Sequence, residues 1–230
     1  MAQINAERAA LGFDGNVVVK DITFCVHRGD YLCIVGENGA GKSTLLKALL
    51  GLHKHLSGTI ELGDGLKRRE LGYLPQQRDV QKDFPASVRE IVLSGFLNGC
   101  GLRPFYNRKE RTLAEECMKK LGVISLADRC YRELSGGQQQ RVLLVRALCA
   151  AKKMILLDEP AAGLDPQAAA DMYDIIYALN RDVGVTVVMV SHDIDAVLKY
   201  STHVLHVGKA SAFFCAAADY AENAGKGRAE

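Results

Sequence analysis

The chain has 230 residues, which is enough for one large domain with a sizeable apolar core. Hydrophobic residues make up 48% and charged residues 24% of it, a composition that is typical of globular proteins and excludes disordered and fibrous classes. The 29 basic and 27 acidic residues give a formal net charge of only +2. The composition therefore indicates neither a nucleic-acid-binding surface nor one that binds anionic lipid.

Apolar stretches, the N-terminus and the cysteines limit where the chain can work. The longest apolar stretches, such as 183–190, are far shorter than the roughly 20 residues that cross a bilayer, so work at a membrane would need another chain's spanning segments. The N-terminus carries Glu7 and Arg8 and lacks a signal-peptide profile, which predicts a cytoplasmic location. Seven scattered cysteines without a C-x-x-C pair favour reduced thiols over disulfides or a zinc site.

The first part of the chain combines two β-rich runs with a glycine-rich turn and a helix. The β-rich runs are residues 17–26 and 31–35, and the turn signal at 27–30 predicts that they pair as strands. The sequence GENGAGKST then occupies 36–44, and apolar residues follow at helical spacing up to Gly51, where a glycine suits the helix C-cap. This stretch is predicted to fold as strand, turn and helix.

The middle of the chain, at about 80–133, is predicted to be a helical insertion. Residues 87–97 and 108–121 have helical periodicity, with glycines and a proline between them. From Ala216 onward the composition is rich in alanine, glycine and charge, which predicts a frayed end.

Strands and helices alternate again after the insertion. Strands are expected at 154–157 and 185–190, with a helix at 166–181 between them. Such alternation predicts an α/β core with a mostly parallel sheet. No internal repeat is found, so the chain contains one such unit.

Residues Gly36, Gly41, Lys42 and Ser43 match the phosphate-loop pattern G-x-x-x-x-G-K-[ST]. The glycines let backbone N–H groups turn inward on phosphate oxygens, and the following helix adds its positive end. Lys42 can reach the β- and γ-phosphates, and Ser43 is placed to bind Mg²⁺. The strand before the motif and the helix after it are the context that this chemistry requires.

An apolar strand ends in two acids, Asp158 and Glu159. A carboxylate at the end of a buried strand beside a phosphate loop can hold Mg²⁺, which is the role expected for Asp158. Glu159 could polarise the attacking water as a general base. This pattern is weak alone, because many α/β strands end in acids, and gains weight from the phosphate loop.

The sequence Leu134-Ser135-Gly136-Gly137-Gln138 precedes a helix with an apolar stripe. Ser135 suits the N-cap, and the two glycines expose backbone donors at the helix N-terminus. The result is a second anion-binding site without a lysine. Because one nucleotide needs only one phosphate loop, such a site makes sense for a nucleotide held by another copy of the chain.

With these motifs in this order, the sequence resembles the ATP-binding cassette (ABC) family over nearly its whole length. L-S-G-G-Q is the signature of that family. The resemblance implies that two cassettes pack head to tail and hold each ATP between the phosphate loop of one and the signature of the other. Ser135 and Gly137 would then contact the γ-phosphate of the partner's nucleotide.

The resemblance also implies the fold class and the domain organisation. We expect a single ABC ATPase domain over 1–230, an α/β fold with a P-loop NTPase core, a mostly parallel sheet, an antiparallel β subdomain and an inserted helical subdomain. The core would comprise about 1–79 and 134–215, the helical subdomain about 80–133, and a flexible tail 216–230.

Further positions match the family one at a time. Gln76 matches the glutamine that senses Mg²⁺ and the attacking water, and His192 matches the switch histidine that hydrogen-bonds the γ-phosphate. Asp165 matches the loop that crosses the dimer interface, although Ala162 stands where many members have Ser or Thr. Phe13 precedes the phosphate loop at the distance where the family has an aromatic residue stacked on adenine, but it is also a candidate core residue.

The resemblance thus implies an ATP hydrolase with ATP and Mg²⁺ as cofactors. The catalytic residues implied are Glu159, His192, Gln76 and Lys42. The metal ligands implied are Ser43, Gln76 and Asp158. The residues expected to contact ATP are Phe13, Gly36, Asn38, Gly39, Ala40, Gly41, Lys42, Ser43, Thr44, Gln76, Asp158, Ser135, Gly136, Gly137, Gln138, Asp165 and His192.

The resemblance points to an importer whose channel lies on another polypeptide. Residues 83–85 and 87–95 look like the helical insertion of the manganese, zinc and iron-chelate importers. The implied partners are a second copy, an integral membrane permease and an extracytoplasmic substrate-binding protein, with no nucleic acid, at the cytoplasmic face of a bacterial cell membrane. The alternatives are the ATPase of an ABC exporter and a soluble ABC ATPase of iron–sulfur cluster assembly.

Two pairs of histidines could suggest direct metal binding. His53 and His55 are interpreted as solvated loop residues, and His203 and His206 as strand-edge residues. No carboxylate or thiol completes either set in the sequence, so neither pair predicts a metal site.

Overall fold

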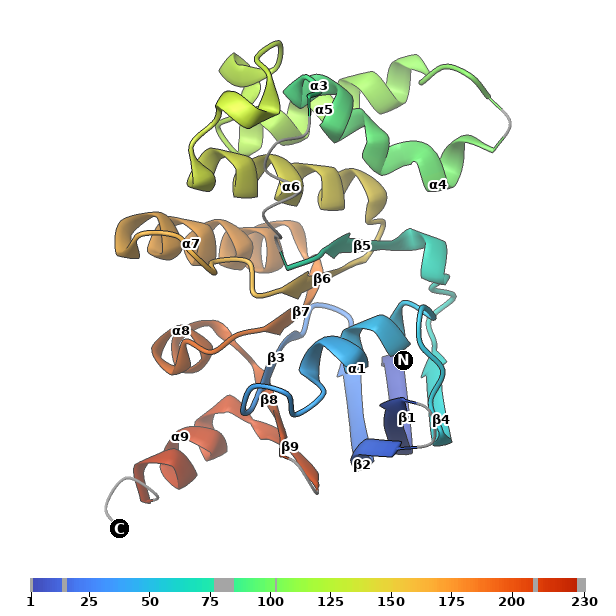
Figure 1. Cartoon of the computed structure of the whole chain (residues 1–230), viewed down its shortest axis with the longest axis vertical. Coiled ribbons are helices and arrows are strands. Elements are labelled where there is room, and N and C mark those ends of the chain that lie inside the picture. Colours follow the sequence, from blue (N-terminus) through green and yellow to red (C-terminus); the bar gives the residue numbers. More distant parts are fainter. Residues whose placement is uncertain (1, 14–15, 77–84, 102, 209–210, 227–230) are drawn as a thin grey trace. The chain divides into compact units, whose positions relative to one another are not determined.

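The computed structural model describes residues 2–13, 16–76, 85–101, 103–208 and 211–226, without the side chains of 13 and 223–226. The chain forms two compact units, the first from residues 1–68 with 179–230 and the second from residues 69–178 (Figure 1). Within the described ranges, no helix combines the length and the apolar character needed to cross a membrane.

The first unit contains a three-stranded antiparallel sheet. Its strands are β1 (Ala2–Phe13), β2 (Asn16–His27) and β4 (Ser57–Leu62), in the order β2-β1-β4. In β2 the buried side chains of Phe24 and Val26 alternate with more exposed ones. This period of two is expected for a strand that has one covered face.

The first unit also contains four strands in the order β7-β3-β8-β9. They are β3 (Tyr31–Val35), β7 (Thr186–Val190), β8 (His203–Val207) and β9 (Ala212–Ala216). The first three are parallel, and β9 runs antiparallel to β8. Every residue of β3 and β7 is buried, because parallel strands are covered on both faces.

The helices of the first unit are α1 (Lys42–Leu49), α8 (Ile194–Tyr200) and α9 (Ala217–Lys226). The structure does not show the frayed end that the composition predicted from Ala216. Instead α9 packs against β9 and α8, and Tyr220 is 8% exposed (Figure 1). The alanine-rich composition did not predict this helix, because its docking depends on few large side chains.

The two β-rich runs near the N-terminus do not pair with each other. The turn at His27–Asp30 separates β2, which pairs with β1, from β3, which pairs with β7 and β8. The prediction of a strand pair was wrong because strand partners are chosen by long-range packing as well as by chain proximity.

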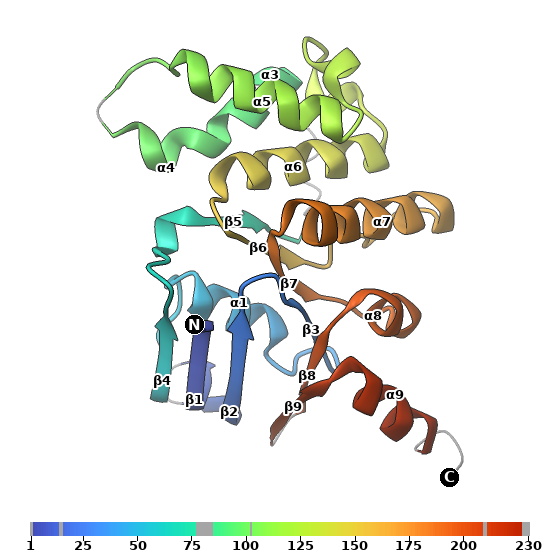
Figure 2. The same cartoon turned by 180° about the vertical axis from the view of Figure 1, so that it is seen from behind.

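Several helices of the second unit pack against one helix, α6 (Gly136–Ala150). The α-helices of this unit are α3 (Val88–Leu93), α4 (Leu97–Cys100), α5 (Arg108–Lys120), α6 and α7 (Pro166–Val183), the last of which ends in the first unit. Its short 3₁₀ helices are η1 (Arg68–Glu70), η2 (Ser94–Phe96), η3 (Ile124–Leu126) and η4 (Tyr131–Glu133). Helices α3 and α5 pack against α6, as Figures 1 and 2 show from opposite sides.

Capping boxes explain where the insertion helices begin. Ser87 caps α3 together with Glu90, and Asn107 caps α5 together with Glu110. The predicted helices at 87–97 and 108–121 are therefore present, the first of them broken by η2.

The second unit keeps these helices together with two parallel strands, β5 (Leu71–Leu74) and β6 (Met154–Asp158). The predicted α/β fold with mostly parallel strands, an antiparallel sheet and a helical segment is confirmed. The division into 1–79 with 134–215 and 80–133 stays a prediction, and residues 77–84 lie outside the described ranges. In the predicted tail 216–230, residues Ala217–Lys226 form α9.

Candidate functional site

The predicted phosphate loop lies between β3 and α1 in the first unit. Gly36, Gly39 and Gly41 have φ angles of 144°, 81° and 97°, which side chains other than glycine rarely adopt. At Gly36 a Cβ atom would lie only 2.0 Å from the carbonyl oxygen of Val207, so no other residue fits there. The loop thus needs its glycines for backbone conformation and for space.

Lys42 begins α1 and is held inside the loop. Its Nζ donates hydrogen bonds of 2.8 Å to the carbonyl oxygens of Gly36 and Glu37, and the residue is 6% exposed. Gly41 is the N-cap, and no side chain of the described residues caps α1. The N-terminal N–H groups and the ammonium together suit an anion such as a phosphate.

The other expected phosphate contacts occupy the same turn. Asn38 and Gly39 are exposed, Ala40 is buried, and Ser43 and Thr44 are half-buried in the first turn of α1. A ligand could therefore reach the middle of the loop while α1 stays anchored in the core.

In the second unit, two predicted catalytic residues are in contact. The Nε2 atom of Gln76 donates a 2.9 Å hydrogen bond to Oε2 of Glu159, although 83 positions separate them. Leu74 lies opposite Leu157 in the parallel pair of β5 and β6, so the ends of both strands lie side by side. Sequence reasoning had assigned each residue separately and missed this contact, because nothing in the spacing reveals it.

The acids at the end of β6 differ in environment. Asp158 is 3% exposed, whereas Glu159 has a φ angle of 52°, in the left-handed region. Residues other than glycine occupy that region at a cost of about 1–3 kcal/mol and cluster at functional sites. Glu159 thus has a strained backbone conformation directly after the strand that ends in Asp158.

The L-S-G-G-Q segment forms the beginning of α6. The Ser135 hydroxyl accepts a hydrogen bond from the Gln138 amide, and Gln138 Oε1 accepts one of 3.0 Å from the Ser135 amide. Ser135 is therefore the N-cap, as predicted.

Neither space nor backbone conformation within the described residues requires the glycines of this segment. A Cβ atom at Gly136 would lie 3.9 Å from Leu164, and one at Gly137 would lie 3.5 Å from Ala168, both ordinary contacts. Neither glycine has a positive φ angle. Glycine weakens a helix relative to alanine, and at these two positions it leaves the backbone at the start of α6 without a Cβ atom above it.

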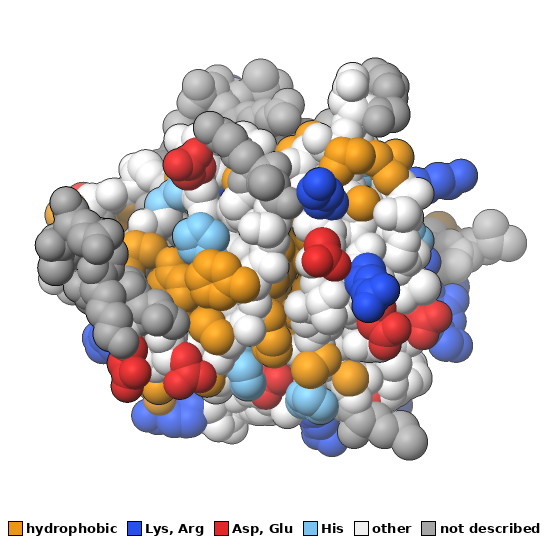
Figure 3. All heavy atoms as spheres, turned by 90° about the horizontal axis from the view of Figure 1, so that it is seen from below, with side chains coloured by type: hydrophobic (Ala, Val, Ile, Leu, Met, Phe, Trp, Pro, Cys, Tyr) orange, Lys and Arg blue, Asp and Glu red, His pale blue; other side chains and the backbone are white. Residues whose placement is uncertain are grey.

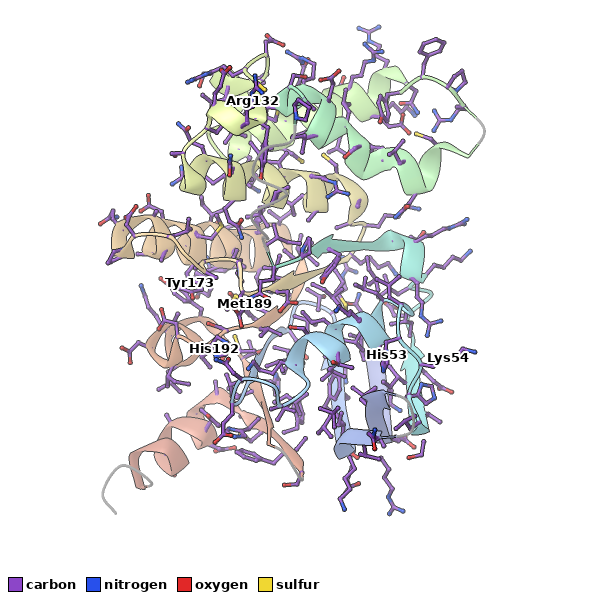
Figure 4. The ribbon with its side chains drawn as sticks, viewed as in Figure 1. His53, Lys54, Arg132, Tyr173, Met189 and His192 are labelled. Atoms are coloured by element: carbon purple, nitrogen blue, oxygen red, sulfur yellow. The ribbon has the colours of Figure 1, made fainter. Side chains whose placement is uncertain are left out.

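The remaining predicted positions are less closely tied to a site. Asp165 Oδ1 accepts a 2.9 Å hydrogen bond from the Ala168 amide and so caps α7. His192 is exposed between β7 and α8 (Figure 4). The stacking role of Phe13 falls on a side chain outside the described ones.

The histidine pairs behave differently from one another. His53 bonds to the Gly12 carbonyl oxygen at 2.8 Å, and Figure 4 shows it with Lys54 on the loop after α1. The interpretation of His203 and His206 as strand-edge residues was wrong, because β8 lies between β3 and β9. Among the described residues, no group of three or more metal-binding side chains forms a metal site.

The ABC transporter family matches residues 19–162, more than half of the chain, including the phosphate loop, Gln76, the signature and both acids. The chain is also 33% identical to the zinc uptake system ATP-binding protein ZurA of Listeria innocua. That alignment covers 94% of this chain and 87% of ZurA. The chain belongs to the ABC transporter family. This ABC ATPase binds ATP and couples its hydrolysis to transport.

Other similar proteins agree with this assignment. The ABC ATPase is 34% identical to the manganese transport system ATP-binding protein MntB of Halalkalibacterium halodurans, over 90% of this chain and 83% of MntB. A solved structure described as a metal-chelate type ABC transporter, in an inward-facing conformation, matches with a TM-score of 0.86 and 29% identity. The match covers 95% of this chain and 85% of the chain in the solved structure. The predicted P-loop fold is therefore confirmed.

Proposed function

We propose that this ABC ATPase powers the import of a metal ion, zinc or manganese, or of a metal chelate, through a separate membrane permease. The observation that carries the proposal is the identity of 33–34% with a zinc uptake and a manganese transport ATP-binding protein over at least 90% of the chain. In this proposal the ATPase lies at the cytoplasmic face of a bacterial membrane, and an extracytoplasmic protein delivers the cargo to the permease.

The proposed working form is a dimer that holds ATP between two copies. The phosphate loop of one copy surrounds the phosphates, with Lys42 as the cation. The second copy contributes Ser135 and Gly137, whose position at a helix N-terminus suits a γ-phosphate. The glycines of α6 support this arrangement, since a nucleotide from outside the chain would be the molecule that approaches them.

Hydrolysis in this proposal needs a base and a divalent cation. The oxygen atoms of Ser43, Gln76 and Asp158 are donors of the kind that Mg²⁺ prefers. When bound, Mg²⁺ would neutralise charge that develops on the phosphate oxygens. The Glu159 carboxylate would take the proton of the attacking water, Gln76 would hold that carboxylate in position, and His192 would hydrogen-bond the γ-phosphate.

The permease would dock in a groove of the second unit. This cavity of about 330 Å³ is mainly apolar, with Glu90 and Arg146 among its charged residues. Pro75, which precedes Gln76, is part of its lining, so a helix seated there would adjoin the Gln76–Glu159 contact. Such a helix would carry apolar side chains for the groove and a carboxylate for Arg146.

Cellular metal content tests the cargo. Source cells that carry Lys42→Ala should lose zinc or manganese selectively under metal restriction, measured by elemental analysis, and should take up less of that metal from labelled medium. Lys47→Ala changes an exposed lysine of the same helix and should leave metals unchanged. Unchanged metals in Lys42→Ala cells that lack other importers would refute metal import.

Copurification tests the groove. Arg146→Glu should reduce recovery of the permease with the ATPase, because it reverses the charge that a docking carboxylate needs. Arg132→Glu, which reverses another exposed arginine of the second unit, should not (Figure 4). Equal recovery with both variants would contradict this docking site. Absence of the wild-type ATPase from membranes would instead favour a soluble ABC ATPase.

A further inference from the structure

Three rings from three elements gather at the C-terminal end of β8. The His206 ring stacks on Phe213 of β9, with centroids 5.0 Å apart and an interplanar angle of 8°. Tyr220 of α9 lies beside both rings, and its hydroxyl hydrogen-bonds to His206 Nδ1 at 3.1 Å. Figure 3, which views the molecule from below, shows hydrophobic and histidine side chains next to each other on this face.

The same end of β8 supports the phosphate loop. In the parallel pairing His206 lies opposite Val35, the last residue of β3 before the loop. The carbonyl oxygen of Val207 is so close to Gly36 that it leaves no room for a Cβ atom. A shift of this strand end would therefore move the first glycine of the loop.

Electrostatics add a second connection between His206 and the loop. Burial lowers the pKa of His206, and the carboxylate of Glu37, the second residue of the loop, opposes that shift. The imidazole is therefore mainly neutral at pH 7, with one donor and one acceptor nitrogen. A neutral ring suits the hydrogen bond with the Tyr220 hydroxyl.

Helix α9 is short and needs packing contacts, such as the one between Tyr220 and His206, to stay helical. It has only 10 residues, and isolated helices shorter than about 12–15 residues are marginal in water. Ala217 and Tyr220 are its buried side chains among those described. Docking through Tyr220 therefore orders the helix against β8 and β9.

We propose that Tyr220 and His206 are positioning residues for nucleotide binding: the α9 tyrosine holds the β8 imidazole, and the end of β8 holds the first turn of the phosphate loop. This inference rests on the phosphate-loop assignment proposed above. It gives α9 a role in ATP affinity that is separate from the chemistry of hydrolysis.

Equilibrium binding of ATP to the purified full-length chain, by isothermal titration calorimetry, tests the inference. Tyr220→Phe keeps the ring and removes the hydroxyl, and it should raise the Kd for ATP about 2- to 10-fold, the range expected for one hydrogen bond. Tyr200→Phe is the matched control. Tyr200 is 7% exposed on the neighbouring α8, and its hydroxyl accepts a hydrogen bond from Lys199 Nζ, whereas the His206 ring bonds to Tyr220.

A double-mutant cycle separates positioning from simple stability. If Tyr220 acts through His206, the pair His206→Ala and Tyr220→Phe should bind ATP no more weakly than His206→Ala alone. A wild-type Kd in Tyr220→Phe, with only Tm lowered, would overturn the inference, as would an equal loss of affinity in Tyr200→Phe. Lys42→Ala, measured alongside, distinguishes failure of this inference from failure of the phosphate-loop assignment. If Lys42→Ala binds ATP normally, the phosphate-loop assignment itself fails.

Discussion

Replacing Gly137 by alanine should separate stability from activity. The added Cβ atom would lie 3.5 Å from Ala168, an ordinary contact, so the fold can accept it. Gly137 is the second residue of α6, and alanine is favoured over glycine in helices by up to about 1 kcal/mol. In a chain of this size that corresponds to a rise in Tm of at most about 4 °C. Thermal stability should therefore stay level or increase.

ATP turnover of the same variant should fall, because the methyl group would lie between the partner's γ-phosphate and the backbone donors of α6. Loss of one such donor typically reduces turnover on the order of 100-fold. The assays are calorimetric unfolding of the ATPase and phosphate release by the assembled transporter.

The control is Gly122→Ala, where φ is 70° with no described atom within 4 Å of the added Cβ. It should lower Tm by about 2–4 °C and leave turnover unchanged. Wild-type turnover in Gly137→Ala would refute the argument that this glycine serves an approaching ligand.

Three other changes test individual assignments. Glu159→Gln should lower ATP turnover at least about 100-fold while ATP binding persists; a wild-type rate would show that Glu159 is not the base. Asp165→Ala removes the acceptor for the Ala168 amide and should cost about 1 kcal/mol, seen calorimetrically as a Tm lowered by about 2–4 °C; an unchanged Tm would contradict its capping role. Burial raises the pKa of Cys33 to about 12, so iodoacetamide at pH 8 should modify it only after unfolding, as mass spectrometry can show; rapid modification in the folded chain would refute this.

Local chemistry made part of the site predictable from sequence. The glycines and Lys42 of the phosphate loop act within a few residues of each other, so their pattern already contains the turn and the helix start. The same holds for Ser135, whose capping partner Gln138 lies three positions away. In both motifs, residues that are close in sequence determine the local backbone structure.

Long-range choices were not predictable in the same way. The partners of β2 and β3 depend on strands far along the chain, and the Gln76–Glu159 contact depends on the pairing of β5 with β6. Helix α9 was missed because a single tyrosine provides much of its docking, and one aromatic residue in an alanine-rich segment produces no periodic pattern.

The hydrogen bond between Gln76 and Glu159 connects two segments that lie 83 positions apart in the sequence. Gln76 leaves the end of β5, next to the groove lined by Pro75, while Glu159 lies at the end of β6. A displacement of either strand end would lengthen this bond and remove the amide that positions the carboxylate. If Glu159 is the base and the permease docks in this groove, as proposed, then partner docking as well as ATP supply would influence when a bound ATP is hydrolysed.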